Sequence, residues 1–310
     1  MNIGIIGTGF GSYHAELLRK MDHVDRVVIF GRNETKLQTL KADLGIEVTN
    51  SIDDILLDPE ITVVDICLPS HLHSQYAIEA LKNGKHVFCE TPVCLELEDA
   101  LAMKQAEEQS GKRVLVNQFI KFEPSYTYLQ ETIQNQKYGK LLSLTLKRET
   151  SPMWGDLGLN TITTNLMIHE LDFLTWLFGA TNLSNVWGAE AEDKKQAHVR
   201  ASYQHHGTFA EIIVSSRMPA AFPFTVSFEA YFEQAKLVFH ESDARDPIQT
   251  ALYEYTSSGQ QMLALNSVNP YEKSLEHAVQ CFHNNSESLI SLDYAIASLK
   301  LAIELRERLY

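Results

Sequence analysis

Cysteine is scarce in this chain, and its spacing offers no disulfide framework. The four cysteines among 310 residues are Cys67, Cys89, Cys94 and Cys281. Cys67 and Cys89 fall in apolar segments predicted as buried strands, where a small thiol packs well. Unpaired cysteines of this kind are typical of a reducing compartment, so we expect a cytoplasmic protein.

Long apolar runs and clusters of positive charge are also missing. No apolar segment is long enough to span a bilayer, and a glycine-rich turn that begins at residue 7 leaves no room for an apolar leader. Lys and Arg number 26 against 40 Asp and Glu, which gives a formal net charge of −14 at pH 7. Because phosphate backbones are bound by clustered Lys and Arg, these absences exclude nucleic acid and a membrane as partners.

Strand and helix patterns alternate through the first 120 residues, with no repeat or low-complexity linker. Asn33 is a plausible N-cap, and Gly84 and Gly111 stand where helices should end. Repeated βα units imply a parallel, doubly wound sheet, so we assign residues 1–121 to an N-terminal Rossmann domain in an α/β fold. After the N-terminal strand, the predicted strands are 26–30, 62–68, 86–89 and 113–119, and the predicted helices are 34–44, 73–83 and 97–109.

The rhythm changes from residue 141 onward. β-rich segments follow with few helices between them, which favours a largely antiparallel second sheet. We assign residues 122–310 to a C-terminal α+β domain with an open, mostly antiparallel sheet. Its predicted strands include 141–147, 197–204, 208–214, 225–232 and 236–239, and two helices at about 271–283 and 292–309 close the chain.

The first turn has the order of residues that binding a dinucleotide requires. Gly7 allows a tight strand-to-helix turn, Gly9 lets the backbone approach a pyrophosphate, and the following helix offers unpaired N–H groups. The third glycine of the fingerprint is Ser12 here. An ordinary βα turn is the alternative, because glycines punctuate many turns. We predict that the residues touching the cofactor are Gly7, Thr8, Gly9, Phe10 and Gly11.

The end of the second strand bears on the choice of cofactor. NAD-preferring sites usually place Asp or Glu there, whereas this chain has Gly31, Arg32 and Asn33. Gly31 leaves room for a 2′-phosphate, and Arg32 offers it a permanently charged partner. The alternative is an ordinary surface arginine before a capping asparagine. We predict NADP(H), with NAD possible, and include Arg32 and Asn33 in the cofactor site.

Residues at the carboxyl ends of the other parallel strands face the same crevice. By this rule we assign Leu68, Pro69, His73 and Glu90 to the cofactor site. His71 and His73 form an H-x-H pair, but no third ligand has convincing spacing nearby, so we predict no metal.

The segments at these strand ends resemble the Gfo/Idh/MocA family, which includes glucose–fructose oxidoreductase and inositol dehydrogenase. Leu68–His73 is similar to the family's T-P-N-x-x-H, and Gly84–Pro92 to its G-K-H-V-x-x-E-K-P. Lys121–Tyr126 is similar to R-F-x-P-x-Y, and Asn165–Asp172 resembles D-x-x-x-H-x-x-D. The resemblance covers essentially the whole chain. It implies a cis bond at the Thr-Pro of the second segment and dimers or tetramers formed through the open sheet.

The departures from the family pattern fall on its catalytic residues. The resemblance implies that hydride passes between C4 of the nicotinamide and a carbinol carbon, while the histidine, His169, handles the hydroxyl proton. The family lysine is Thr91 here, and the aspartate before the histidine is Asn165. Threonine can hydrogen-bond but carries no charge, so the electrostatic help of the lysine is missing.

The predicted helix 163–178 can also be interpreted without the family. Asn165, His169 and Asp172 form one polar stripe at i, i+4 and i+7 on an otherwise apolar helix. A solvated face or a structural His–Asp pair is the alternative to catalysis. We further hypothesise that Lys121 supplies part of the missing positive charge; it could instead be a surface lysine or a partner for Glu123.

Together these patterns predict an NADP(H)-dependent oxidoreductase acting on a sugar, cyclitol or related polyhydroxy compound. His169 is the predicted general acid/base, with Thr91, Asn165 and Lys121 beside it. We expect a homodimer or homotetramer. The alternative is a cofactor-binding sensor or regulator of the same fold that has lost catalysis.

Overall fold

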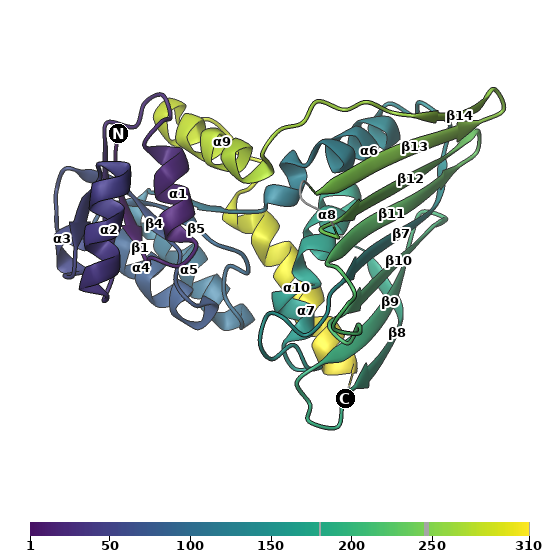
Figure 1. The fold of residues 1–310 in the computed structure, drawn as a ribbon, viewed down its shortest axis with the longest axis horizontal. Coiled ribbons are helices and arrows are strands. Elements are labelled where there is room, and N and C mark those ends of the chain that lie inside the picture. Colours follow the sequence, from purple (N-terminus) through teal and green to yellow (C-terminus); the bar gives the residue numbers. More distant parts are fainter. Residues whose placement is uncertain (180, 245–247, 310) are drawn as a thin grey trace. The chain divides into compact units, whose positions relative to one another are not determined.

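The computed structural model describes residues 1–179, 181–244 and 248–309 of the chain (Figure 1). It divides into two compact units. The first comprises Met1–Phe119 and Asn269–Leu299, and the second Ile120–Val268 and Lys300–Tyr310. Within the described ranges, no helix combines the length and apolar character that crossing a bilayer requires.

The first unit contains a six-stranded parallel sheet with strand order β3-β2-β1-β4-β5-β6. The order reverses beside β1, which is the arrangement of a Rossmann fold and confirms the predicted class. Its strands are β1 Asn2–Ile6, β2 Arg26–Phe30, β3 Glu47–Thr49, β4 Ile61–Ile66, β5 His86–Cys89 and β6 Val114–Val116. Its helices are α1 Gly11–Leu18, α2 Glu34–Leu44, α3 Asp53–Leu56, α4 His73–Lys82 and α5 Leu97–Ser110, with a 3₁₀ turn, η1, at Ser70–Leu72.

Capping residues set the helix ends of this unit as the sequence predicts. The Asn33 side chain accepts a hydrogen bond from the Lys36 backbone N–H at 3.0 Å and begins α2. Gly111 ends α5 in the left-handed conformation. The predicted strand 113–119 is shorter, because the Gln118 N–H turns back onto the carbonyl oxygen of Val116. A 3₁₀ turn, η2, at Phe119–Phe122 follows.

Part of the C-terminal region groups with the first unit, whereas the sequence placed it in the second domain. Helix α9, Pro270–Asn284, packs against α1, and the Asn269 amide donates to the Tyr13 hydroxyl. The Val116 N–H donates to the Ile290 carbonyl oxygen at 2.8 Å, extending the edge of the sheet. The Tyr13–Asn269 pairing links residues 256 positions apart, a separation that local patterns do not reveal.

The second unit contains an eight-stranded sheet with order β14-β13-β12-β11-β7-β10-β9-β8. All neighbours are antiparallel except β7 and β10, which confirms a mostly antiparallel sheet. Its strands are β7 Leu141–Glu149, β8 Asn182–Glu190, β9 Ala197–His205, β10 Thr208–Ser215, β11 Thr225–Phe232, β12 Ala235–Ser242, β13 Gln249–Thr256 and β14 Gly259–Met262. Its helices are α6 Pro124–Gln134, α7 Ile162–Asn165, α8 Ile168–Phe178 and the end of α10, Leu292–Arg308.

Helices cover one face of this sheet (Figure 1). Leu144 and Leu146 of β7 belong to a buried core shared with Phe173 of α8 and Leu305 of α10. Alternate residues point the other way and stay exposed, including Phe209, Tyr231 and Tyr255. The helix-free face therefore presents aromatic side chains to its surroundings.

The predicted helix 163–178 is two helices, which corrects the single polar stripe. The Thr164 hydroxyl donates to the Thr161 carbonyl oxygen, and the Met167 N–H reaches back five residues to Ile162. Such bonds compete with the regular ladder and rotate the chain between α7 and α8. Asn165 is exposed at the end of α7, so it does not share a stripe with His169.

Candidate active site

The glycine turn of the first unit is built for close backbone approach. Gly7 has φ 115°, and a Cβ there would lie 2.5 Å from the Cys67 carbonyl oxygen. A Cβ on Gly11 would lie 2.9 Å from Ile5 Cγ2, so Gly11, rather than Ser12, allows the close packing of α1 on β1. Around Gly9, by contrast, an added Cβ would meet no atom within 4 Å. The turn thus leaves space at the position where a pyrophosphate would approach.

The N-terminus of α1 lies directly after this turn. Phe10, 40% exposed, precedes the helix, and its side chain makes no capping hydrogen bond. The first N–H groups of a helix need acceptors, and a phosphate oxygen is a suitable one. Thr8 packs against Gly31, and a Cβ on Gly31 would lie 2.4 Å from Thr8 Cγ2. A larger residue at position 31 would therefore press on Thr8. The exposed Arg32 follows Gly31 at the end of β2.

His73 connects two strand-end loops of the first unit. It begins α4, and its ring nitrogens lie 2.7 Å from the Leu68 carbonyl oxygen and 2.9 Å from that of Pro92. Burial lowers the pKa of His73, against the effect of these carbonyl groups. The Thr91–Pro92 peptide bond is cis, as expected. His73 thus holds the Leu68–Pro69 loop and the Thr91–Pro92 turn together.

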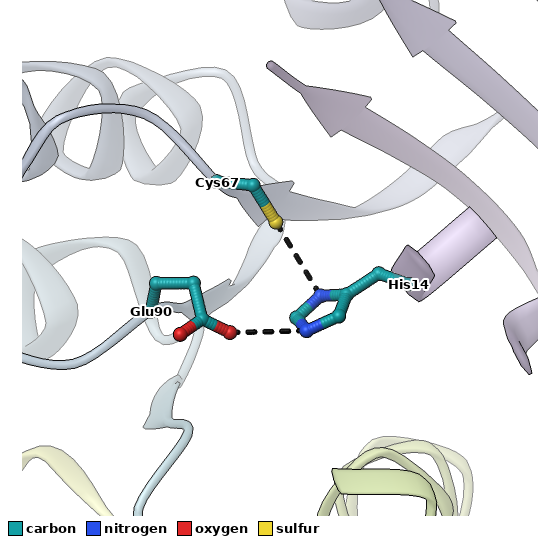
Figure 2. Close-up of side chains that lie close together, drawn as sticks. All are labelled: His14, Cys67 and Glu90. Atoms are coloured by element: carbon teal, nitrogen blue, oxygen red, sulfur yellow. Dashed lines mark hydrogen bonds and ion pairs between the residues drawn. The ribbon is translucent and has the colours of Figure 1, made fainter. Parts of the chain in front are cut away.

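A polar network surrounds His14, and Figure 2 shows the ring beside Glu90 and Cys67. His14, on α1, has Nδ1 2.8 Å from Asp65 Oδ2 and Nε2 3.0 Å from Glu90 Oε1. Glu90 Oε1 also accepts from Asn117 Nδ2 at 2.7 Å, and the Thr91 hydroxyl donates to the Asn117 carbonyl oxygen at 2.9 Å. We call Asp65, His14, Glu90, Asn117 and Thr91 the His14 network.

The charge state of His14 follows from several neighbours together. Burial is the largest influence on the pKa of His14 and would lower it, but the charge of Asp65, the electrostatic effect of Cys67 and the hydrogen bonds to both residues together hold this pKa well above 6.5. Cys67 Sγ lies 3.4 Å from His14 Nδ1, and burial raises the pKa of this thiol, which therefore stays protonated.

His14, Cys67 and Glu90 also form a possible set of metal ligands, with donor atoms within 4.8 Å of one another. It is the one such group within the described residues, and it differs from the His71–His73 pair that the sequence considered. Both nitrogens of His14 face carboxylate oxygens, so the ring suits two protons better than a metal ion. The sequence missed this group because Cys67 and Glu90 lie far along the chain from His14.

The second unit holds a separate buried polar cluster. Arg148 on β7 is 6% exposed, and its Nε donates to both carboxylate oxygens of the fully buried Glu170, at 2.8 and 3.0 Å. His169 precedes Glu170 on α8. Burial, and then the positive charge of Arg148, hold the pKa of His169 well below 6.5. His169 is therefore a neutral imidazole at neutral pH, able to accept a proton.

Lys121 belongs to the same unit and is 2% exposed, so it is not a surface lysine. Burial lowers the pKa of Lys121 to about 7, although the charge of Asp172 acts in the opposite direction. The Glu123 side chain accepts hydrogen bonds from the Ser125 N–H and hydroxyl, and so caps α6. Burial, and then Glu241, raise the pKa of Glu123 to about 7. The charged neighbour of Lys121 is thus Asp172.

The Arg148–Glu170 pair and the buried Tyr126 are features that the sequence analysis missed. The Tyr126 hydroxyl has no hydrogen-bond partner among the described atoms, although the side chain is 1% exposed. A signal for Arg148 existed, because it follows Leu144 and Leu146 at the spacing of one strand face. A charge at such an inward position calls for a buried partner.

Comparisons with known proteins agree with the fold and the glycine turn. Residues 1–118 match the GFO_IDH_MocA model, described as an oxidoreductase family with an NAD-binding Rossmann fold. This region belongs to the Gfo/Idh/MocA family. The sequence resemblance is thereby confirmed for the part of the chain that carries the dinucleotide fingerprint.

Named relatives of the Gfo/Idh/MocA region include inositol dehydrogenases. Myo-inositol 2-dehydrogenase of Thermotoga maritima is 28% identical over 184 residues, covering 58% of this chain and 55% of the relative. Inositol 2-dehydrogenase/D-chiro-inositol 3-dehydrogenase of Lactiplantibacillus plantarum is 30% identical over 182 residues, covering 56% and 51%. The chain thus spans about half the length of these curated relatives.

Solved structures match the fold along nearly the whole chain. KijD10, a 3-ketoreductase from Actinomadura kijaniata in complex with NADP, has TM-score 0.83 and 15% identity over 99% of this chain and 97% of its own. UDP-N-acetylglucosamine 3-dehydrogenase GnnA from Acidithiobacillus ferrooxidans has TM-score 0.81 and 19% identity over the same shares. Identities this low establish a shared fold along the chain and nothing about substrate.

Proposed function

We propose that the protein is an NADP(H)-dependent oxidoreductase that transfers a hydride between nicotinamide and a carbinol carbon of a sugar, cyclitol or related polyhydroxy compound. The observation that carries the proposal is the buried cluster of the second unit. The second unit contributes an imidazole, His169, and an amine, Lys121, whose pKa values are both lowered. Lys121, with a pKa of about 7, exchanges its proton at neutral pH, and the neutral His169 can accept one. The names of the relatives, which are dehydrogenases of inositols, agree with this substrate class.

The first unit fits the dinucleotide. Gly7–Gly11 would receive the pyrophosphate, Arg32 and Asn33 would lie at the ribose 2′-phosphate, and Leu68, Pro69, His73 and Glu90 would line the crevice. When bound, the nicotinamide supplies or accepts the hydride. Arg32 supports NADP(H) over NAD because it is exposed and can pair with a phosphate. The bound NADP in KijD10 is consistent with this choice.

The second unit would handle the substrate proton. His169, neutral and partly buried, would take the hydroxyl proton during oxidation and return it during reduction. Lys121 with a pKa of about 7 is partly protonated at neutral pH, so its ammonium would stabilise the developing alkoxide. Thr91 already donates its hydroxyl proton to Asn117, which leaves it an acceptor role. Asn165, exposed on α7, would contribute at most to the rim of the site.

A regulator that binds the cofactor without turnover is the second candidate function. The observation that favours it is the absence of a charged residue at Thr91, together with the exposure of Asn165. Incubation of the full chain with NADPH or NADP⁺ and a panel of keto-sugars, sugars and cyclitols separates the two. Consumption of the cofactor that depends on one of these compounds supports the enzyme. Nucleotide binding without consumption across the panel supports the regulator.

We also propose that the helix-free face of the second sheet mediates a homodimer or homotetramer. Phe209, Tyr231 and Tyr255 lie in one cross-strand row on this face, by the register of β10, β7, β11, β12 and β13. Each is more than a third exposed. Exposed aromatic patches of this kind are typical of protein interfaces.

A further inference from the structure

The proton handling proposed above makes no use of His14. The side chain is 0% exposed and stands one turn into α1, directly after the glycine turn. Asp65 at its Nδ1 is 1% exposed and comes from β4. Glu90, which follows β5, lies at its Nε2 (Figure 2). The imidazole therefore lies between the carboxylates of Asp65 and Glu90.

This placement determines which protonation state satisfies the ring. A neutral imidazole has one N–H, so one of its nitrogens would present a lone pair to a carboxylate oxygen about 3 Å away. A histidinium donates an N–H to Asp65 and places its second N–H in an ion-pair contact with Glu90, at 3.0 Å but outside the angles of a regular hydrogen bond. The other titratable group at the ring is the thiol of Cys67, the residue directly after β4, and Phe10 and Phe88 supply aromatic contacts. Among these neighbours the two carboxylates carry the charge, and both favour the cation.

The same carboxylate connects His14 to Thr91. Glu90 Oε1, 3.0 Å from His14 Nε2, also accepts the hydrogen bond of Asn117 Nδ2 at 2.7 Å. The Asn117 backbone carbonyl then accepts the Thr91 hydroxyl at 2.9 Å. The His14 network therefore links α1, β4 and the ends of β5 and β6 at the carboxyl edge of the sheet, where a dinucleotide binds.

We propose that His14 is a positioning residue: as a buried histidinium it holds Glu90, and through Asn117 it fixes the Thr91 turn for cofactor binding and hydride transfer. The effect of His14 on catalysis rests on the proposed function. The protonation state and the dinucleotide affinity can be measured without any turnover, so a failure of one proposal is distinguishable from a failure of the other.

The first test reads the protonation state directly. The full chain is labelled with ¹⁵N in its histidine rings, and the His14 signals are assigned by their loss in His14→Gln. We expect doubly protonated ¹⁵N shifts at about pH 8, where a free histidine is neutral. In Glu90→Gln, which removes one carboxylate, the ring should titrate at lower pH. A neutral His14 at pH 7, or a change in its signals on adding one equivalent of Zn²⁺, would overturn the proposal.

The second test measures coupling. We expect His14→Gln and Glu90→Gln each to weaken NADPH binding about tenfold, and the double variant to weaken it no further, as for residues of one network. His283→Gln, an exposed histidine of the same unit, is the matched control and should bind like the wild type. Circular dichroism establishes that each variant is folded. Folded single variants with unchanged affinity, or effects that multiply in the double variant, contradict the proposal.

Discussion

At the scale of single residues, burial decides the chemistry of this protein. Lys121 and His169 are ordinary residue types whose pKa values move because the second unit removes them from water. The sequence predicted the identity of both residues from the matched segments. It could not predict their protonation, because that depends on Arg148 and Asp172, which other elements contribute. Asn165 shows the opposite case, since it matches the motif in spacing but is exposed.

Lys121→Met should lower kcat at least about tenfold, or about 1.4 kcal/mol in the barrier, because the alkoxide loses its cation. NADPH affinity should be intact. His169→Ala should cost more, about a hundredfold, because the proton acceptor itself is removed. Steady-state kinetics on the substrate found in the panel provide the measurement, with Lys147→Met on the other face of β7 as the control. An unchanged kcat in Lys121→Met would remove this residue from the mechanism.

The free energy of unfolding should carry a pH dependence from Lys121. Its folded pKa of about 7 lies below the unfolded value of about 10.4, so between these pH values the unfolded chain binds more protons. Stability from this group therefore rises as pH increases from about 7 to about 10. Urea unfolding measures this effect. The free energy of unfolding of Lys121→Met minus that of the wild type should fall as the pH rises across that window. If this difference in free energy does not change with pH, the pKa of Lys121 is not lowered by burial in the folded chain.

Arg32→Ala should weaken NADPH binding about ten- to a hundredfold, because one charge-assisted contact to phosphate contributes about 1.5–3 kcal/mol. NADH binding should barely change, since NADH lacks the 2′-phosphate. Fluorescence titration of the purified protein with both nucleotides measures this. A wild type that prefers NADH, or a variant that loses both equally, would show that the end of β2 does not select the cofactor.

At the scale of elements, the two sheets differ in how readily a sequence predicts them. β2 and β5 have the bounds that the sequence predicts, because buried parallel strands are apolar runs between helices. β8, β13 and β14 were not named, because they are half-exposed and mixed in composition, and β14 is exposed throughout. The sequence also did not predict the division between α7 and α8, because this division depends on a hydrogen bond from a threonine hydroxyl to the backbone.

The glycine turn yields a matched pair of substitutions. Gly7→Ala should destabilise the fold by about 1–3 kcal/mol, because φ is 115° and the new Cβ would meet the Cys67 carbonyl oxygen. Gly9→Ala has open space around its Cβ, so its stability should be nearly unchanged while dinucleotide affinity falls. Thermal unfolding and NADPH titration measure the two effects. Equal NADPH affinity in Gly9→Ala and the wild type would place the pyrophosphate elsewhere.

At the scale of the whole molecule, the helix-free sheet face predicts self-association. Tyr231→Glu should lower the oligomeric mass, because it places a charge in the row that Phe209 and Tyr255 flank. Leu57→Glu, at an exposed leucine of the first unit, is the control and should leave the mass unchanged. Light scattering coupled to gel filtration gives the mass. A monomeric wild type would contradict this assembly.

The central claim is hydride transfer to a polyhydroxy compound, and isotope transfer tests it most directly. The full chain is incubated with NADPH deuterated at C4 and the keto forms of the panel, beside His169→Ala, and the products are analysed by mass spectrometry. The account predicts deuterium on the carbinol carbon of one product class, and at least about a hundredfold less with His169→Ala. Bound NADPH with no deuterium in any product, from wild type and variant alike, would contradict it and identify a regulator.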